Sequence, residues 1–221
     1  MPFAHECASD ASTLEESVKL LKPTCIIGVS GQPQTFTQEV IAEMAANNKQ
    51  PIIFALSNPT SKAECTAEQA YQWSEGKAIF ASGSPFPEVE YGGKTYQPAQ
   101  GNNAYIFPGI GKGALYCGAT KLDSIDMIVA SRTLASLVPE EMLEKGACYP
   151  DLLTVRDVSV VIAADIALGQ WERGTALKEN TAKDRDELVE QIRHSMYVWA
   201  RGMERSEGGG SVLDYVTPSS I

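Results

Sequence analysis

TCIIGVS at residues 24–30 is the first of three short apolar runs, and PIIFALS at residues 51–57 and AIFAS at residues 78–82 are the others. Each run is continuous rather than alternating, which is typical of parallel strands buried on both faces. Pro51 is compatible with a strand because it opens its run. We therefore expect three neighbouring parallel strands.

Segments with helical spacing separate these runs. Residues 12–22 precede the first run, and Ser12 with Glu15 forms a capping-box pattern there. Residues 37–48 and 66–77 have helical spacing after the first and second runs. A β-α-β-α-β order with short connections predicts right-handed crossovers. The expected fold class is therefore α/β, a partial Rossmann-like, doubly wound parallel sheet followed by helices.

The pattern changes after the third run. Residues 89–97 alternate around Gly92-Gly93, which predicts a β-hairpin. An apolar helix is expected from about Gly109 onward. Further helices are expected at residues 123–138, 139–146, 155–174 and 184–202, with Thr154 and Asp157 capping the third of them. We expect residues 1–200 to form a sheet with trailing helices, and the polar, glycine-rich residues 201–221 to form a tail.

Composition excludes several classes of partner. The chain has 221 residues and a formal net charge of −10, whereas a nucleic acid or anionic membrane needs clustered Lys and Arg.

No apolar run reaches the roughly 18 residues of a membrane span, and the first residues lack a signal-peptide pattern. The cysteines are scattered and form no C-x-x-C pair: Cys7, Cys25, Cys65, Cys117 and Cys148. We expect reduced thiols in an intracellular compartment, either cytoplasm or an organelle matrix.

Small polar residues follow each predicted strand where it ends. In an open α/β sheet, ligands bind outside the carboxyl ends of the strands. Three such endings in succession favour a ligand-binding edge over ordinary turn chemistry. The endings are Ser30-Gly31, Ser57-Asn58 and Ser82-Gly83-Ser84.

Two clusters of side-chain amides are candidate binding groups. Asn58 precedes Pro59, which favours an extended backbone, and its amide suits a carboxamide or a hydroxy acid. An Asx-turn is an equal alternative. Asn102 and Asn103 precede an apolar helix whose positive end favours a carboxylate. A helix-capping loop is an equal alternative there.

The remaining motifs predict no binding or catalytic site. Gly109, Gly111 and Gly113 form G-x-G-x-G without a preceding strand, so close helix packing is favoured over a phosphate loop. His5 and His194 have no metal-ligand spacing. The remaining acidic residues of the later helices are interpreted as solvated faces: Asp123, Asp126, Glu140, Glu141 and Glu144. No acid–base pair or metal site is predicted.

Five longer stretches together resemble one family. They are KPTCIIGVSG (22–31), FTQEVIAEMA (36–45), PIIFALSNPTSKAECTAEQAY (51–71), AIFASGSPF (78–86) and QGNNAYIFPG (100–109). They resemble malic enzymes, and the similarity covers about residues 2–200. The resemblance implies oxidative decarboxylation of L-malate to pyruvate and CO2, with NAD or NADP as hydride acceptor and Mg2+ or Mn2+ required.

The resemblance also implies roles for individual residues. The backbone of Gly28, Val29, Ser30 and Gly31 would lie along the dinucleotide, with Ser57 beside it. Asn58 would contact both the nicotinamide and the substrate, and Asn102 and Asn103 would bind malate. Residues 32–34 and the tail after Gly202 depart from the family pattern, which leaves the loop on the cofactor side and the subunit contacts open.

The family's catalytic tyrosine and lysine, its metal ligands and its first phosphate-binding turn precede this segment. The resemblance therefore implies no catalytic residue and no metal ligand here, and a chain that is inactive without the missing amino-terminal part. It also implies a homo-oligomer. The alternative is a stand-alone module without catalysis, either a dinucleotide sensor or a subunit-interaction module. The choice between NAD and NADP is open, because the residues that read the ribose 2′ position lie upstream.

Overall fold

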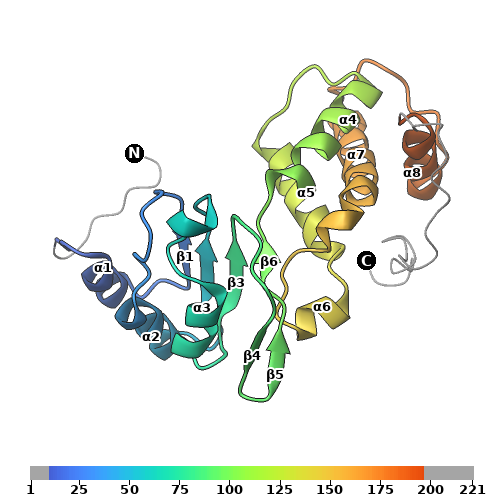
Figure 1. Ribbon diagram of the computed structural model, residues 1–221. Coiled ribbons are helices and arrows are strands. Elements are labelled where there is room, and N and C mark those ends of the chain that lie inside the picture. Colours follow the sequence, from blue (N-terminus) through green and yellow to red (C-terminus); the bar gives the residue numbers. More distant parts are fainter. Residues whose placement is uncertain (1–9, 197–221) are drawn as a thin grey trace. The chain divides into compact units, whose positions relative to one another are not determined.

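The computed structural model describes residues 10–196, which divide into two compact units (Figure 1). The sheet unit comprises residues 10–101 and 141–148, and the helical unit comprises residues 102–140 and 149–196. Each unit has hydrophobic clusters of its own.

The sheet unit contains four parallel strands in the order β1-β2-β3-β6. They are β1 (Cys25–Gly28), β2 (Ile52–Ala55), β3 (Ile79–Ser82) and β6 (Ala99–Gln100). The three predicted strands and the α/β class are confirmed. The sequence analysis missed β6, because two residues after Pro98 are too few to form an apolar run.

Three helices cover one face of this sheet: α1 (Leu14–Leu21), α2 (Gln38–Asn47) and α3 (Ala67–Trp73). Ile26, Ile53 and Phe80 point into one cluster with Met44 of α2 and Tyr71 of α3. Burial of each such large side chain contributes about 1.5–3 kcal/mol. The helices lie on one face because sequential right-handed crossovers in one direction return on the same side.

The prediction that the first strand is buried on both faces is wrong. Ile26 is buried, but 58% of Ile27 and 74% of Val29 are exposed. Successive side chains of a strand point to opposite faces. Ile27 thus lies on the face opposite the helices, and β1 is the edge strand in the described sheet. The strand also ends at Gly28, two residues earlier than predicted.

The predicted cap of α1 is shifted by one residue. Thr13, not Ser12, is the N-cap, and its Oγ1 accepts a hydrogen bond from the N–H of Glu16. The N–H of Ser12 donates to the Glu16 carboxylate at 2.7 Å. The capping-box pattern fits this stretch in two registers, either Ser12 with Glu15 or Thr13 with Glu16. The capping box of α3, formed by Thr66 and Gln69, is present.

The predicted hairpin is confirmed, with β4 (Val89–Tyr91) paired antiparallel to β5 (Lys94–Tyr96). Gly92 and Gly93 at its turn have φ of 61° and 78°, which suits glycine. The short helix α6 (Glu140–Glu144) leads into residues that join the sheet unit, where the N–H of Gln97 donates to the carbonyl of Lys145 at 2.9 Å.

The helical unit is built around α7 (Val155–Glu172). The other helices are α4 (Phe107–Cys117), α5 (Ser124–Ser136) and α8 (Arg185–His194), with 3-10 turns η2 (Asn103–Tyr105) and η3 (Leu152–Thr154); a further turn, η1 (Thr60–Lys62), belongs to the sheet unit. A Cβ on Gly113 would lie 2.5 Å from the carbonyl oxygen of Ala163 in α7, and one on Gly109 would lie 2.7 Å from the Ile162 side chain. The close-packing interpretation is confirmed for Gly109 and Gly113 but not for Gly111, whose ideal Cβ position has no atom within 4 Å.

Four expectations about the helical unit are wrong. Helix α4 begins at Phe107 rather than Gly109, because Pro108 is favourable in a first turn. Thr154 makes no side-chain cap for α7, since its hydroxyl donates back to Asp151 within η3. Asp157, its predicted partner, pairs instead with Arg193 of α8.

Asp126 is the third correction, because it is not a solvated carboxylate. Its exposed fraction is 1%, and it accepts hydrogen bonds from Arg173 and Gln170. The sequence pattern did not reveal this network because its partners lie more than 40 positions away. The last predicted helix is also wrong in its end, because α8 ends at His194 with Ser195 as its C-cap, and not at residue 202. The tail lies outside the described residues.

Candidate cofactor edge of the sheet

The carboxyl ends of β1, β2 and β3 lie side by side. Gly28 is paired with Ala55, and Ala55 with Ser82. The ladder continues past the strands, because the N–H of Leu56 donates to the Gly28 carbonyl at 2.9 Å and the N–H of Gly83 to the Ala55 carbonyl at 3.1 Å. The three predicted strand endings therefore share one edge of the sheet, which we call the carboxyl edge.

The end of β1 opens onto a cavity of about 340 Å³. Gly28, Val29 and Ser30 line it, and Val29 and Ser30 are exposed. Gly31 follows with φ of 69°, a conformation that suits glycine. The remaining lining residues are Leu14, Ile27, Gln32, Thr35, Phe36 and Glu64. A ligand in this cavity would meet the backbone of the β1 end.

Ser57, at the end of β2, has a buried hydroxyl that is already engaged. It donates to the buried carboxylate of Glu64 and accepts from the N–H of Gly31 at 2.9 Å. Ser57 thereby joins the β2 end to the loop after β1. Sequence reasoning identified Ser57 but missed Glu64, which stands in the loop that leads to α3.

Asn58 is exposed at the same edge, and the third strand ending holds its side chain. The hydroxyl of Ser84 donates to Asn58 Oδ1 at 2.6 Å. A Cβ on Gly83 would lie 2.2 Å from the Leu56 carbonyl oxygen and 2.9 Å from Asn58 Nδ2, so glycine is required there. Asn58 Oδ1 thus accepts from a neighbouring strand ending rather than forming an Asx-turn. Its Nδ2 is the side-chain group left to donate to a ligand oxygen.

Asn102 and Asn103 begin the helical unit, directly after Gly101. The N–H of Gly101 donates to the Ser82 carbonyl at 2.8 Å. Asn102 Oδ1 accepts from the N–H of Ala104 at 2.9 Å, so Asn102 caps η2. The capping alternative therefore holds for Asn102, while Asn103 has an exposed side chain. That these amides meet Asn58 around one substrate stays a prediction.

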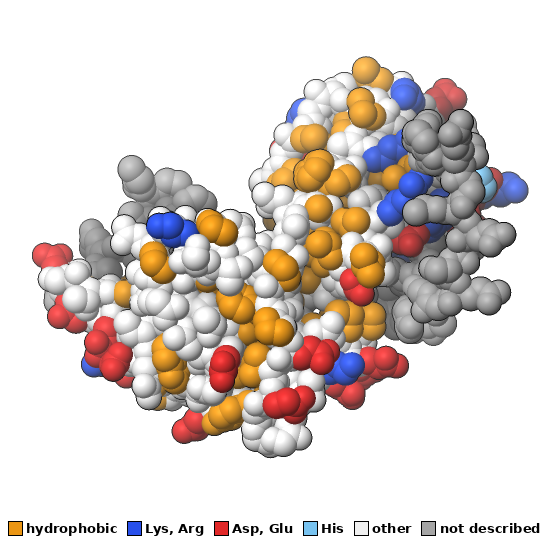
Figure 2. Space-filling model, viewed as in Figure 1, with side chains coloured by type: hydrophobic (Ala, Val, Ile, Leu, Met, Phe, Trp, Pro, Cys, Tyr) orange, Lys and Arg blue, Asp and Glu red, His pale blue; other side chains and the backbone are white. Residues whose placement is uncertain are grey.

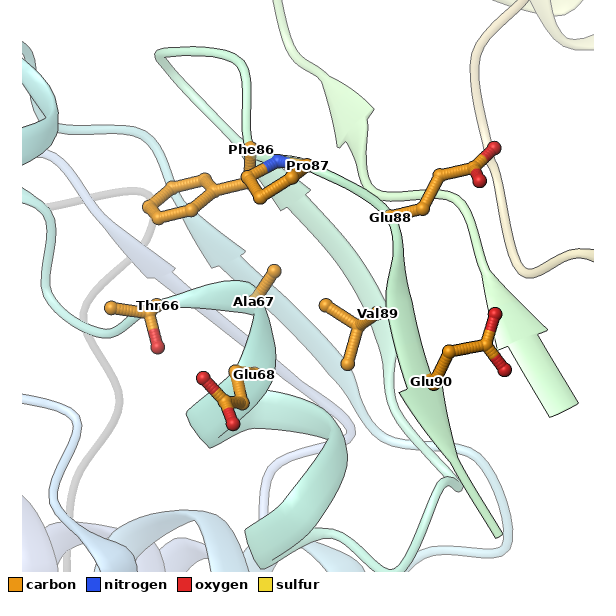
Figure 3. A pocket seen from close by; sticks show the side chains of 8 residues that line it. All are labelled: Thr66, Ala67, Glu68, Phe86, Pro87, Glu88, Val89 and Glu90. Atoms are coloured by element: carbon orange, nitrogen blue, oxygen red, sulfur yellow. The ribbon is translucent and has the colours of Figure 1, made fainter. Parts of the chain in front are cut away.

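A second cavity, of about 400 Å³, lies between the start of α3 and β4 (Figure 3). Ala67 and Val89 point toward each other across it, whereas Glu88 and Glu90 extend to the other side of β4. None of the cofactor- or substrate-binding residues predicted from the sequence lines it. The carboxyl edge is therefore the better candidate site.

Metal-binding groups and membrane-spanning helices are both absent among the described residues. Residues 10–196 contain no group of three or more His, Cys, Asp or Glu placed to hold a metal ion. No helix in that range is long and apolar enough to cross a membrane. On the face shown in Figure 2, acidic side chains are spread over the sheet unit, in line with the net charge of −10.

The described cysteines are free thiols, as predicted. Burial raises the pKa of Cys65 to about 12 and that of Cys148 to about 11. Both thiols are therefore protonated near neutral pH, and neither has the lowered pKa of a nucleophilic cysteine.

Comparison with known proteins then decides the family. Residues 2–169 match the family model of the malic enzyme NAD-binding domain. The chain belongs to the malic enzyme family. Its relatives include NADP-dependent malic enzyme 2 of Arabidopsis thaliana, 49% identical over 89% of this chain, and the chloroplastic NADP-dependent malic enzyme of Oryza sativa subsp. japonica, 46% identical over 88%.

Solved malic enzymes have the same fold. The malic enzyme of Entamoeba histolytica aligns with a TM-score of 0.61 and 25% identity over 82% of this chain and 33% of its own. The malic enzyme of Pyrococcus horikoshii aligns with the same TM-score at 24% identity, over 82% of this chain and 36% of its own. At this identity the likeness shows the fold alone. The chain spans about a third of the length of its malic enzyme relatives, 33% of the Arabidopsis protein and 30% of the rice protein.

Proposed function

We propose that this chain is the nucleotide-binding part of a malic enzyme that oxidatively decarboxylates L-malate to pyruvate and CO2. The observation that carries the proposal is the carboxyl edge, where the cavity at Gly28 and the side chain of Asn58 follow adjacent strands. The family match supports the same reaction. Since the relatives' names are NADP-dependent malic enzymes, NADP is the proposed cofactor.

The carboxyl edge suits a dinucleotide in two respects. Gly28, Val29 and Ser30 line an open cavity, and Val29 and Ser30 are exposed there. Asn58 is exposed, and because its Oδ1 accepts from Ser84, its Nδ2 is the side-chain group left to donate to a ligand. When bound, the nicotinamide ring would accept the hydride that leaves malate C2.

The proposed role of this chain is positioning. Asn58 would orient the nicotinamide, and Asn102 and Asn103 would orient the carboxylates of malate. Such positioning is a large part of catalysis, because a misplacement of about 1 Å can cost on the order of 100-fold in rate. The metal ligands and the proton-transferring tyrosine and lysine are proposed to lie on the missing amino-terminal part, in a homo-oligomeric enzyme.

Calorimetric titration of the full 221-residue chain with NADP and NAD tests the proposal. We expect weak NADP binding, with a Kd on the order of 0.1–1 mM, because only part of a dinucleotide site is present. We also expect no turnover of malate with Mg2+ or Mn2+. A chimera in which this chain replaces the matching segment of the Arabidopsis enzyme should regain NADP-dependent decarboxylation.

Two other outcomes would replace this proposal. Micromolar NADP binding by the chain, with an inactive chimera, would indicate a stand-alone dinucleotide sensor. No nucleotide binding, together with stable self-association in light scattering, would indicate a subunit-interaction module.

A further inference from the structure

Glu64 is a buried carboxylate that the proposed reaction does not use. Its exposed fraction is 1%, and it stands between η1 and α3 in the sheet unit. The carboxylate accepts hydrogen bonds from the hydroxyl of Ser57 and, at 3.4 Å, from the N–H of Ser57. Burying a carboxylate is costly unless hydrogen bonds replace its water. Ser57 supplies these bonds.

Ser57 also bonds to the loop that follows β1 at the carboxyl edge. The Ser57 hydroxyl has a single proton, which it donates to Glu64. Its lone pairs are therefore left to accept, and one accepts from the N–H of Gly31 at 2.9 Å. Glu64 thus fixes the direction in which Ser57 presents its oxygen to Gly31.

Two backbone hydrogen bonds hold the same loop farther along. The N–H of Gln34 donates to the Ala63 carbonyl at 3.1 Å, and the N–H of Phe36 donates to the Glu64 carbonyl at 3.0 Å. Residues 63–64 therefore hold the loop 31–36 at its far end, while the Glu64 side chain holds its near end through Ser57.

Gly28 is part of the same arrangement. A Cβ on Gly28 would lie 2.4 Å from both Cγ and Cδ of Glu64. The carboxylate therefore packs directly against the last residue of β1, and the absence of a side chain there allows this approach. Gly28 and Glu64 both line the cavity of about 340 Å³.

We propose that Glu64 is a positioning residue for the dinucleotide, acting through Ser57 to hold Gly31 and the end of β1 in the shape that binds the cofactor. The inference rests on the proposed function. Glu64 is too buried to be a main contact of the cofactor. Its effect reaches the ligand through the backbone of Gly31.

The test compares variants of the full 221-residue chain by NMR. Glu64→Gln retains the shape of the side chain but places an amide donor where an acceptor is needed. Ser57→Ala removes the hydroxyl that joins Glu64 to the N–H of Gly31. Glu68→Gln is the matched control, because Glu68 is exposed at the start of α3 and has no bond to Ser57 or Gly31 among the described residues. Amide exchange at Gly31 and the NADP dissociation constant are measured for each.

We expect Glu64→Gln and Ser57→Ala each to speed Gly31 exchange and to weaken NADP binding by about 3- to 10-fold, the range of one hydrogen bond. The double variant should lose no more affinity than the worse single variant, because both act through one series of bonds. Glu68→Gln should match the wild type. A merely structural Glu64 would lower the thermal midpoint and leave the NADP dissociation constant unchanged.

The failures are distinguishable. If the wild-type chain binds NADP and both variants bind it equally well, the role of Glu64 is refuted while the proposed function stands. Additive losses in the double variant would also refute it. If the wild-type chain shows no saturable response to NADP, the proposed function fails, and the inference fails with it.

Discussion

Asn58 depends on a residue far away in sequence for its orientation. Ser84 donates to Asn58 Oδ1 across adjacent strand endings, 26 positions apart. An exposed amide would otherwise sample several rotamers, and fixing one in advance lowers the entropy lost when a ligand binds. The exposed, held side chain is therefore suited to the ligand-orienting role that we propose for it.

Asn58→Ala should consequently lower activity far more than stability. In the active chimera, we expect turnover to fall on the order of 100-fold, since the nicotinamide loses its orienting contact. The thermal midpoint should hardly change, because Asn58 is exposed. Steady-state kinetics and a thermal melt on the same preparation check this. Proportionate losses in both would contradict it.

The contacts of single residues at the site show the limit of sequence reasoning. The strand endings were predictable, because small polar residues after apolar runs mark the carboxyl edge of a parallel sheet. The bonds from Ser84 to Asn58 and from Ser57 to Glu64 were not, since nothing in the local pattern says which hydroxyl meets which acceptor.

Helix α4 shows how the sequence specifies packing at the scale of an element. Gly113 allows α4 to approach the Ala163 carbonyl of α7, whereas Gly111 has no atom within 4 Å of its ideal Cβ position. The three glycines thus differ in role although they share one motif.

Gly113→Ala should destabilise the chain by about 1–3 kcal/mol through overpacking against α7. Gly111→Ala is the matched control, and it should stabilise by about 0.5–1 kcal/mol because alanine loses less backbone entropy in a helix. Denaturant unfolding of both variants measures the two free energies. Equal effects would show that α4 and α7 do not pack as closely as described.

The elements themselves were largely predictable, and the errors have local causes. Continuous apolar runs fixed β1 to β3, but β6 has only two residues and no such run. Ser12 and Thr13 compete for the same cap, so the register of α1 was ambiguous. The exposure of Ile27 could not be foreseen, because it depends on which elements cover the second face of the sheet.

At the scale of the molecule, each hydrophobic cluster of residues 10–196 is made of residues from one unit. The cluster around Phe80 belongs to the sheet unit, and the clusters around Ile162 and Ala163 belong to the helical unit. The sequence pattern located apolar residues but did not reveal this partition, which depends on long-range contacts.

Separate cores predict two thermal transitions for the full chain, because cooperativity follows the contacts within each core. Gly113→Ala should lower only one midpoint, and Phe80→Leu should lower only the other. Differential scanning calorimetry of the three proteins checks this. A single transition that both substitutions shift equally would mean that the units unfold as one.

The central claim is that the carboxyl edge of β1, β2 and β3 binds the cofactor. Mapping amide chemical shifts of the full chain during an NADP titration tests it most directly. We predict saturable changes concentrated at residues 28–31, 57–58 and 82–84. Saturable changes concentrated instead around Ala67 and Val89, with the strand endings unmoved, would contradict the claim.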